Sequence, residues 1–137
     1  MDAVEIADFL KSRETGVLGL AKEDDAYAIP LSYTYEEGAT SIYFRLGYGP
    51  GSQKREFVDA SNIVTFVVYT KTAAAWKSVM AQGRLSELST SSLDSSIVES
   101  VKSLDIPFYQ VHDRPVADLE ISIVELSISH LHGIVGG

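Results

Sequence analysis

Residues 16–35 read GVLGLAKEDDAYAIPLSYTY and give the clearest indication of the fold. Two runs rich in apolar and β-forming residues, GVLGLAK and AYAIPLSYTY, flank the polar turn Glu23-Asp24-Asp25. Runs of this length around a short polar turn are typical of a β-hairpin. Because no helix lies between the two runs, we expect them to pair in antiparallel fashion.

Further β-type runs follow the hairpin. In residues 40–46 (TSIYFRL) the apolar side chains at even positions face one way, while Tyr43 and Arg45 face the other. Residues 62–71 (NIVTFVVYTK) form the most β-like run of the chain, and residues 75–88 (AWKSVMAQGRLSEL) predict another strand. The three early runs are joined by tight turns with no helix between them, which favours antiparallel pairing.

Two β-bulges are expected. Gly83 is predicted to be a bulge, or a point where another backbone approaches closely. The run 117–129 alternates in two phases, with one parity in Leu119, Ile121 and Ile123 and the other in Val124, Leu126 and Ile128. A bulge near Ile123-Val124 would bring both sets to the same face.

Short helices are expected around these strands. Asp2 and Glu5 have the spacing of a capping box, so residues 3–12 are predicted to form an amphipathic helix. Residues 52–61 (SQKREFVDAS) predict about two helical turns that begin at Ser52. A third helix is predicted in residues 90–106, whose apolar positions at helical spacing are Leu93, Ile97, Val98, Val101 and Leu104.

The number and order of these segments predict the architecture. A chain of 137 residues suits one domain with its own hydrophobic core, and no linker or repeat divides residues 1–137. The early strands follow one another without an intervening helix, which indicates a mainly β fold. We expect a small closed or half-closed antiparallel β-barrel with peripheral helices, because closure leaves few sheet edges unpaired.

The composition limits the classes of partner. Lys and Arg total 11 against 19 Asp and Glu, which gives a formal net charge of −8 and a pI near 4.7. This balance argues against nucleic acid, whose binding relies on many Lys and Arg contacts to phosphates. The absence of cysteine excludes disulfides and thiolate catalysis. No run approaches the roughly 18 apolar residues of a membrane span, and residues 1–14 lack signal-peptide features, so we expect a cytoplasmic protein without a membrane partner.

Residues 45–57 (RLGYGPGSQKREF) concentrate flexible backbone and positive charge in this acidic chain. Arg45 ends a predicted strand, and Ser52 opens a helical turn that contains Lys54 and Arg55. Unpaired N–H groups at a helix N-terminus, a hydroxyl and cations are donors that bind phosphate. The same residues also suit a solvated loop capped by a short helix, although basic residues in a first turn interact unfavourably with the helix dipole. From local sequence, both interpretations stand.

Catalysis by side chains alone has little support in the sequence. The chain contains no G-x-x-x-x-G-K-[ST], G-x-G-x-x-G or G-x-S-x-G motif. His130 and His132 alternate along the last predicted strand and therefore face the same way, but no third metal ligand is evident. We expect no metal site and no assignable catalytic residue, so any chemistry would come from a bound cofactor.

The segments GVLGLA, YAIPLSYTY, IYFRLGYGPGSQKREF, NIVTFVVY and AWKSVMAQGRL occur in this order along the chain. Their order and spacing resemble the pyridoxamine 5'-phosphate oxidase-like family of FMN-binding split barrels, and most of all its small single-domain members of the nitroimidazole-resistance type. The likeness covers about residues 5–88 and, more loosely, the last strand. It implies a six-stranded antiparallel split barrel that pairs as a homodimer and holds FMN in a groove at the dimer interface.

The resemblance also implies site residues. In that family a strand bearing P-x-S lies along the flavin ring, which corresponds here to Ile29, Pro30, Leu31, Ser32 and Tyr33. A proline in mid-strand agrees with a ligand-facing position and equally with a plain edge strand. The family's phosphate-binding segment corresponds to Arg45, Ser52, Gln53 and Lys54. Trp76 falls where the family brings a side chain to the cofactor from the partner chain, and it also suits a core or dimer contact.

The expected function is that of an FMN-binding flavoprotein, an oxidoreductase that acts on an unknown small molecule. The C-terminal R-x-W type segment of the vitamin-synthesising oxidase is absent, which argues against pyridoxamine phosphate as the substrate. Three alternatives remain open: a reductase that uses a deazaflavin coenzyme on the same barrel, a haem protein ligated by His130 or His132, and a dimeric barrel that binds a ligand without turnover.

Overall fold

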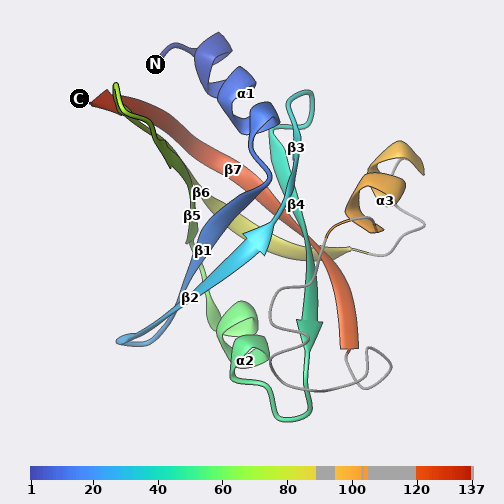
Figure 1. Ribbon diagram of the computed structural model, residues 1–137. Coiled ribbons are helices and arrows are strands. Elements are labelled where there is room, and N and C mark those ends of the chain that lie inside the picture. The colour runs from blue at the N-terminus through green and yellow to red at the C-terminus, as the bar shows by residue number, and fades with distance from the viewer. Residues whose placement is uncertain (89–94, 103, 105–119, 137) are drawn as a thin grey trace.

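The computed structural model describes residues 1–88, 95–102, 104 and 120–136 (Figure 1). The helices are α1 (Ala3–Ser12), α2 (Gln53–Ala60) and α3 (Ser95–Lys102). The strands are β1 (Thr15–Lys22), β2 (Asp25–Ser32), β3 (Thr34–Glu36), β4 (Ser41–Tyr48), β5 (Val64–Lys71), β6 (Trp76–Leu88) and β7 (Glu120–Gly136). None of the helices in this part of the chain is long and apolar enough to cross a membrane.

The strands form one seven-stranded antiparallel sheet in the order β2-β1-β5-β6-β7-β4-β3. The predicted hairpin is confirmed, since β1 pairs with β2 from Thr15↔Ser32 to Lys22↔Asp25. Its turn places Glu23 at φ 54°, in the left-handed region that tight hairpin turns require. The seventh strand is the three-residue β3, which pairs with the start of β4 where the sequence suggested a continuation of β2.

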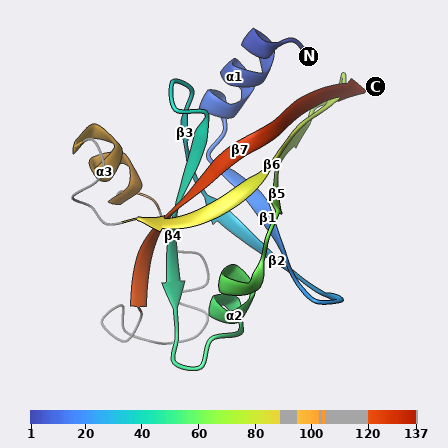
Figure 2. The same cartoon turned by 180° about the vertical axis from the view of Figure 1, so that it is seen from behind.

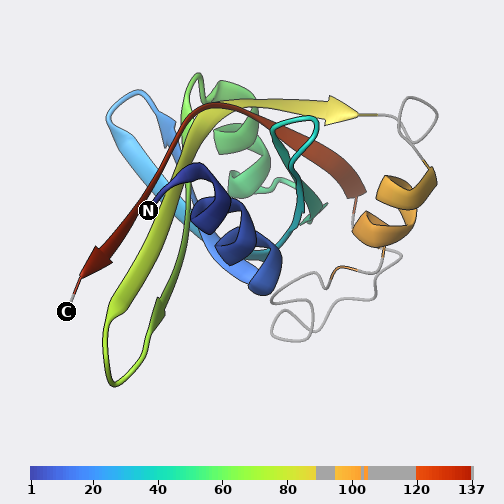
Figure 3. The same cartoon turned by 90° about the horizontal axis from the view of Figure 1, so that it is seen from above.

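The sheet curls around a hydrophobic core until β2 contacts β4 (Figure 3). Every long strand contributes side chains to this core, among them Leu18, Leu31, Phe44, Phe66, Val79 and Leu126. Helix α1 covers one end of the barrel and α2 covers the other (Figure 1). Burying each such aliphatic or aromatic side chain contributes about 1.5–3 kcal/mol, which explains why the strands close into a barrel. The predicted mainly β split-barrel fold is confirmed.

Helix α3 lies on the outer face of the barrel, beside β4 and β7 (Figure 2). Val101 of α3 packs with Tyr43 of β4 and Ile123 of β7 in a second, smaller apolar cluster. Ile97 and Leu104 extend that cluster, as the helical spacing predicts, whereas Leu93 lies outside the described residues. β4 and residues 123–126 of β7 are therefore buried on both faces.

The bulge predicted near Ile123-Val124 is wrong. Both residues keep an unbroken register with β4, and they also pair with the end of β6 without a shift. The two parities of this run are both apolar because one faces the core while the other faces α3. The bulge of β7 lies at Ser129 instead, where Gln82↔His130 is followed by Gly83↔Ile128.

The prediction for Gly83 is confirmed. Gly83 sits opposite the bulge of β7, and a Cβ placed on it would collide with the carbonyl group of Ser127. Only glycine permits the two backbones to come this close. Because the bulge changes which side chains of β7 face inward, Gly83 allows β6 and β7 to remain paired along the whole length of β6.

Candidate functional site

The family-implied segment 29–33 presents two different faces. Ile29, Leu31 and Tyr33 are buried in the core, and the Tyr33 hydroxyl donates a hydrogen bond of 2.6 Å to the Leu10 carbonyl. Pro30 is exposed and Ser32 half-buried, so β2 turns these two side chains outward. β2 is an edge strand, as a proline in mid-strand predicts. Any ligand along β2 therefore meets Pro30, Ser32 and the strand's backbone.

The phosphate-type segment forms the first turn of α2. Ser52 is the N-cap, and its hydroxyl accepts a hydrogen bond of 3.3 Å from the backbone N–H of Arg55. Gln53 is exposed, whereas the Lys54 ammonium is half-buried and donates to the Gly47 carbonyl at 2.9 Å. Burial lowers the pKa of Lys54, because desolvation disfavours its charged form. Lys54 thus ties α2 to the end of β4.

Arg55 is neutralised by carboxylates. Its guanidinium makes a bidentate pair with Glu87 of β6, at 2.9 and 3.2 Å, and a further contact with Asp59 at 3.2 Å. Glu87 also accepts a hydrogen bond from the Ser122 hydroxyl. The hydrogen bond from Arg55, followed by that from Ser122, lowers the pKa of Glu87. Sequence reasoning missed Glu87, because nothing local marks a partner that is 32 residues away.

Arg45 faces α3 instead of α2. It projects from the outer face of β4, and its Nη1 donates to the carbonyls of Lys102 and Leu104, at 3.1 and 3.4 Å. These carbonyls lie at the C-terminal end of α3, where the helix dipole favours a cation. Within the described residues neither Arg45 nor Lys102 forms an ion pair with a carboxylate.

A pocket of about 460 Å³ opens beside Arg45, and we call it the outer pocket. Its lining residues are Arg45, Glu87, Leu88, Lys102, Ile121, Ser122 and Ile123. The pocket thus combines two cations with apolar side chains from β6 and β7, while its carboxylate is already bound by Arg55. Such an arrangement suits an anion with a flat apolar body. Lys102 was also missed from the sequence, since it ends a serine-rich helix with no site-like motif.

The outer pocket and the first turn of α2 adjoin each other. Gly47, which accepts from Lys54, pairs directly with the pocket residue Ile121. Glu87 lines the pocket and binds Arg55. The structure therefore gathers the predicted phosphate residues at one end of β4, although each cation points to a different protein group.

Trp76 lies at the other end of β6, away from the outer pocket. Its side chain is 48% exposed, and its ring lies 6.2 Å from that of Tyr69 and 5.3 Å from the Lys71 ammonium. The strand pairings Tyr69↔Ser78 and Ser78↔Ile134 put Ile134, which is 60% exposed, on the same outer face. We call Tyr69, Trp76 and Ile134 the exposed apolar patch.

The two histidines of β7 share an exposed face. His130 pairs with Gln82 and His132 with Met80, so both imidazoles lie on the outer side, as their spacing predicts. In the described part of the chain no group of three His, Cys, Asp or Glu side chains is arranged to hold a metal ion.

Comparison with known proteins places this architecture in a family. The model of the family described as pyridoxamine 5'-phosphate oxidase matches residues 2–135. The chain belongs to this family. The resemblance seen in the sequence is thereby confirmed. No curated protein matches the sequence.

Several solved structures share the fold of this pyridoxamine 5'-phosphate oxidase family member. A FAD-binding protein from Mesorhizobium loti superposes with a TM-score of 0.74 at 24% identity, covering 100% of this chain and 96% of that one. A FAD-binding protein from Mycobacterium smegmatis gives 0.68 at 16% identity, covering 99% and 96%. A putative 5-nitroimidazole antibiotic resistance protein from Bacteroides thetaiotaomicron gives 0.67 at 14% identity, covering 98% and 84%.

Proposed function

We propose that this protein binds a flavin, FMN, and acts as a flavin-dependent oxidoreductase on a small molecule. The observation that carries the proposal is the outer pocket, where Arg45 and Lys102 stand beside apolar walls without a carboxylate partner among the described residues. Family membership supports it, as do solved relatives of the same fold described as FAD-binding proteins.

The residues present fit a flavin with a single phosphate. A phosphate carries up to two negative charges, which Arg45 and Lys102 can balance. The side chains of Leu88, Ile121 and Ile123 form an apolar wall beside these two cations, which strengthens their attraction for the phosphate by excluding water. FMN is favoured over FAD because the described residues provide one pair of unpaired cations at this pocket, whereas FAD would bring a second phosphate and an adenosine.

The roles of the chain's own residues follow from their positions. Arg45 and Lys54 supply charge at the same end of β4, while Ser52 and Gln53 begin the helix whose first N–H groups have no partner within the helix. We assign the phosphate to these groups, and the flavin ring to the outward face of β2, with Pro30 and Ser32 beside it. When bound, FMN supplies hydride and electron transfer, and the barrel orients it and limits its contact with water.

A homodimer is the partner we propose. The exposed apolar patch supports it, because large apolar side chains that share one face of a sheet commonly form an interface between chains. Trp76 begins β6, whereas the outer pocket of the same chain lies at the end of β6. Trp76 would therefore contact the flavin that the partner chain binds. Light scattering should report two chains per particle, and Trp76→Ala should shift the population towards monomers. A monomer that retains flavin would contradict this arrangement.

The test of the cofactor is an absorbance spectrum of the purified protein, followed by mass spectrometry of the compound released on denaturation. We expect flavin bands and the mass of FMN. The mass of FAD would keep the flavin but refute the single-phosphate assignment. A deazaflavin mass, a Soret band, or a colourless protein that fails to quench the fluorescence of added FMN would refute the proposal.

A further inference from the structure

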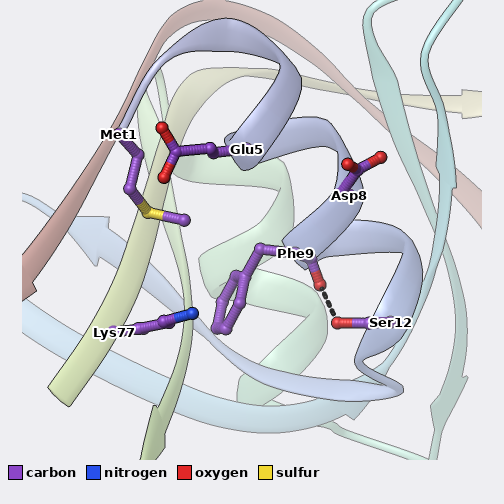
Figure 4. Close-up of a pocket in the computed structure, with 6 residues that line it drawn as sticks. All are labelled: Met1, Glu5, Asp8, Phe9, Ser12 and Lys77. Carbon is purple, nitrogen blue, oxygen red and sulfur yellow. Dashed lines mark hydrogen bonds between the residues drawn. The ribbon is translucent and has the colours of Figure 1, made fainter. Parts of the chain in front are cut away.

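A second pocket lies between α1 and β6, on the opposite face of β6 from the exposed apolar patch. It measures about 340 Å³ and is lined by Met1, Glu5, Asp8, Phe9, Ser12 and Lys77 (Figure 4). All but Lys77 come from α1 or its N-terminal extension, and they recur at the spacing of one helix face. Lys77 reaches in from β6 on the opposite side (Figure 4). We call this the helix pocket.

The helix pocket is separate from the outer pocket. The two share no lining residue, and β6 contributes Lys77 to one and Glu87 and Leu88 to the other. Lys77 lies one residue from the start of β6 and Leu88 is its last residue. Nothing in the flavin proposal uses the helix pocket, so the two sites can be tested independently.

Charges of opposite sign face each other across this pocket without meeting. Glu5 and Asp8 lie on the helix side, and Lys77 on the strand side. Lys77 forms no ion pair with any described residue, although two carboxylates line the same pocket. Glu5 uses one oxygen for the capping box with the backbone N–H of Asp2, at 3.4 Å, which leaves its second oxygen available.

The remaining surface of the pocket is apolar. The ring of Phe9 and the side chain of Met1 lie between the charged groups (Figure 4). The Ser12 hydroxyl already donates to the Phe9 carbonyl at 2.8 Å, so it can offer the pocket only an acceptor. A ligand here therefore needs a cationic end, an anionic end and a small apolar body.

We propose that the helix pocket binds a small zwitterion, a free amino acid with an apolar side chain. Its ammonium group pairs with Glu5 and Asp8, its carboxylate pairs with Lys77, and its side chain packs on Phe9 and Met1. The pocket volume lies at the lower end of the range for small-molecule sites, about 300–1,000 Å³. Glu5, Asp8 and Lys77 are all exposed, so each can contact a bound zwitterion without giving up a salt bridge within the described residues.

The test uses three probes with the same apolar body: leucine, isopentylamine, which lacks the carboxylate, and 4-methylpentanoate, which lacks the ammonium. Isothermal titration calorimetry on the full-length protein as purified should show leucine binding at least about tenfold more tightly than either analogue, since each loses one charge-assisted contact. Equal affinity of leucine and isopentylamine would overturn the proposal, as would the absence of saturable leucine binding. These comparisons need no mutation.

Two matched lysine variants assign the contact. Lys77→Met should weaken leucine binding about tenfold or more and leave isopentylamine unchanged, because only the carboxylate contact is lost. Lys71→Met removes the same charge from the same hairpin, outside the pocket lining, and should leave both ligands unchanged. Equal losses in the two variants would show a general charge effect and overturn the assignment.

A third variant tests the helix side of the pocket. Glu5→Gln, which still fits a capping box, should weaken the binding of leucine and of isopentylamine alike.

Discussion

Two arginines near one end of the barrel show opposite situations. Arg55 sits where the sequence suggests a phosphate ligand, yet its guanidinium is held by two carboxylates, Glu87 and Asp59. Among the described residues, the hydrogen-bond partners of Arg45 are carbonyl oxygens at the end of α3, and Arg45 lines a pocket with Lys102. A cation that is already paired must give up its partner before it can bind an anion, whereas a cation on carbonyls keeps its full charge.

The position of a basic residue in a motif is therefore weaker evidence that it binds an anion than the identity of the groups it contacts. Charge-assisted pairs are strong when both groups are held in place, and an incoming phosphate gains little from an arginine that a carboxylate already neutralises. Anion affinity should therefore follow Arg45 first, Lys54 second and Arg55 last.

The largest expected effect comes from Arg45→Met. The variant should lose about 1.5–3 kcal/mol of FMN binding free energy, roughly a 10- to 150-fold increase in Kd. Fluorescence quenching of FMN measures this loss. Arg84→Met, which removes a guanidinium that binds Asn62 away from both pockets, is the matched control and should bind FMN normally. Equal losses in the two variants would show a general effect of removing positive charge and would contradict a specific role for Arg45.

A smaller loss is expected from Lys54→Ala. Its ammonium already donates to the Gly47 carbonyl, so fewer of its three donors are available to a phosphate. We expect a loss near the lower end of the charge-assisted range, about 1.5 kcal/mol. An unchanged Kd in the same titration would remove Lys54 from the site.

Glu87→Gln should have the opposite sign. Removing this carboxylate leaves Arg55 with Asp59 as a carboxylate partner and takes a negative charge out of the outer pocket. Because the pair is partly exposed, the gain in FMN affinity should be modest, about 0.2–1 kcal/mol. Glu56→Gln makes the same charge change outside the pocket lining and serves as the control. Weaker FMN binding in Glu87→Gln would show that Arg55 needs its partner in order to bind.

The smallest effect concerns pH. Burial lowers the pKa of Lys54 below the usual 10.5, so the free protein loses this charge at a lower pH than an exposed lysine would. Since only the ammonium form attracts a phosphate, FMN affinity should begin to fall before the pH reaches 10.5. Lys54→Arg should remove this early decrease. An identical pH profile in both proteins would contradict the role of Lys54.

Much of the fold could be predicted because its signals are local. The hairpin at 16–35, the capping box of Asp2 and Glu5 and the N-cap Ser52 each depend on residues close in sequence. The bulge at Ser129 could not be placed, because its cause is a pairing with Gln82 and Gly83 in a distant strand. In the first part of β7, the side chains on both faces are apolar because one face packs on the core and the other packs on α3. The contact with α3 is tertiary and cannot be read from the alternation of residues.

The candidate site was less predictable than the fold. Arg45, Ser52 and Lys54 do gather at one end of β4, but the sequence did not show that Arg45 turns to α3. Three further residues of the site come from segments far along the chain: Glu87, Lys102 and Ser122. Their residue types alone do not indicate a function. The resemblance to a family indicated a flavin as the ligand, whereas the partners of each cation were found only from the structure.

The most direct test of the central claim titrates wild-type protein and Arg45→Met with both FMN and riboflavin, which lacks the phosphate. We expect wild-type protein to prefer FMN, and Arg45→Met to lose this preference while its affinity for riboflavin stays the same. An equal loss for both ligands would show that Arg45 only supports the fold. A preference for FMN that survives in Arg45→Met would place the phosphate elsewhere and contradict the account.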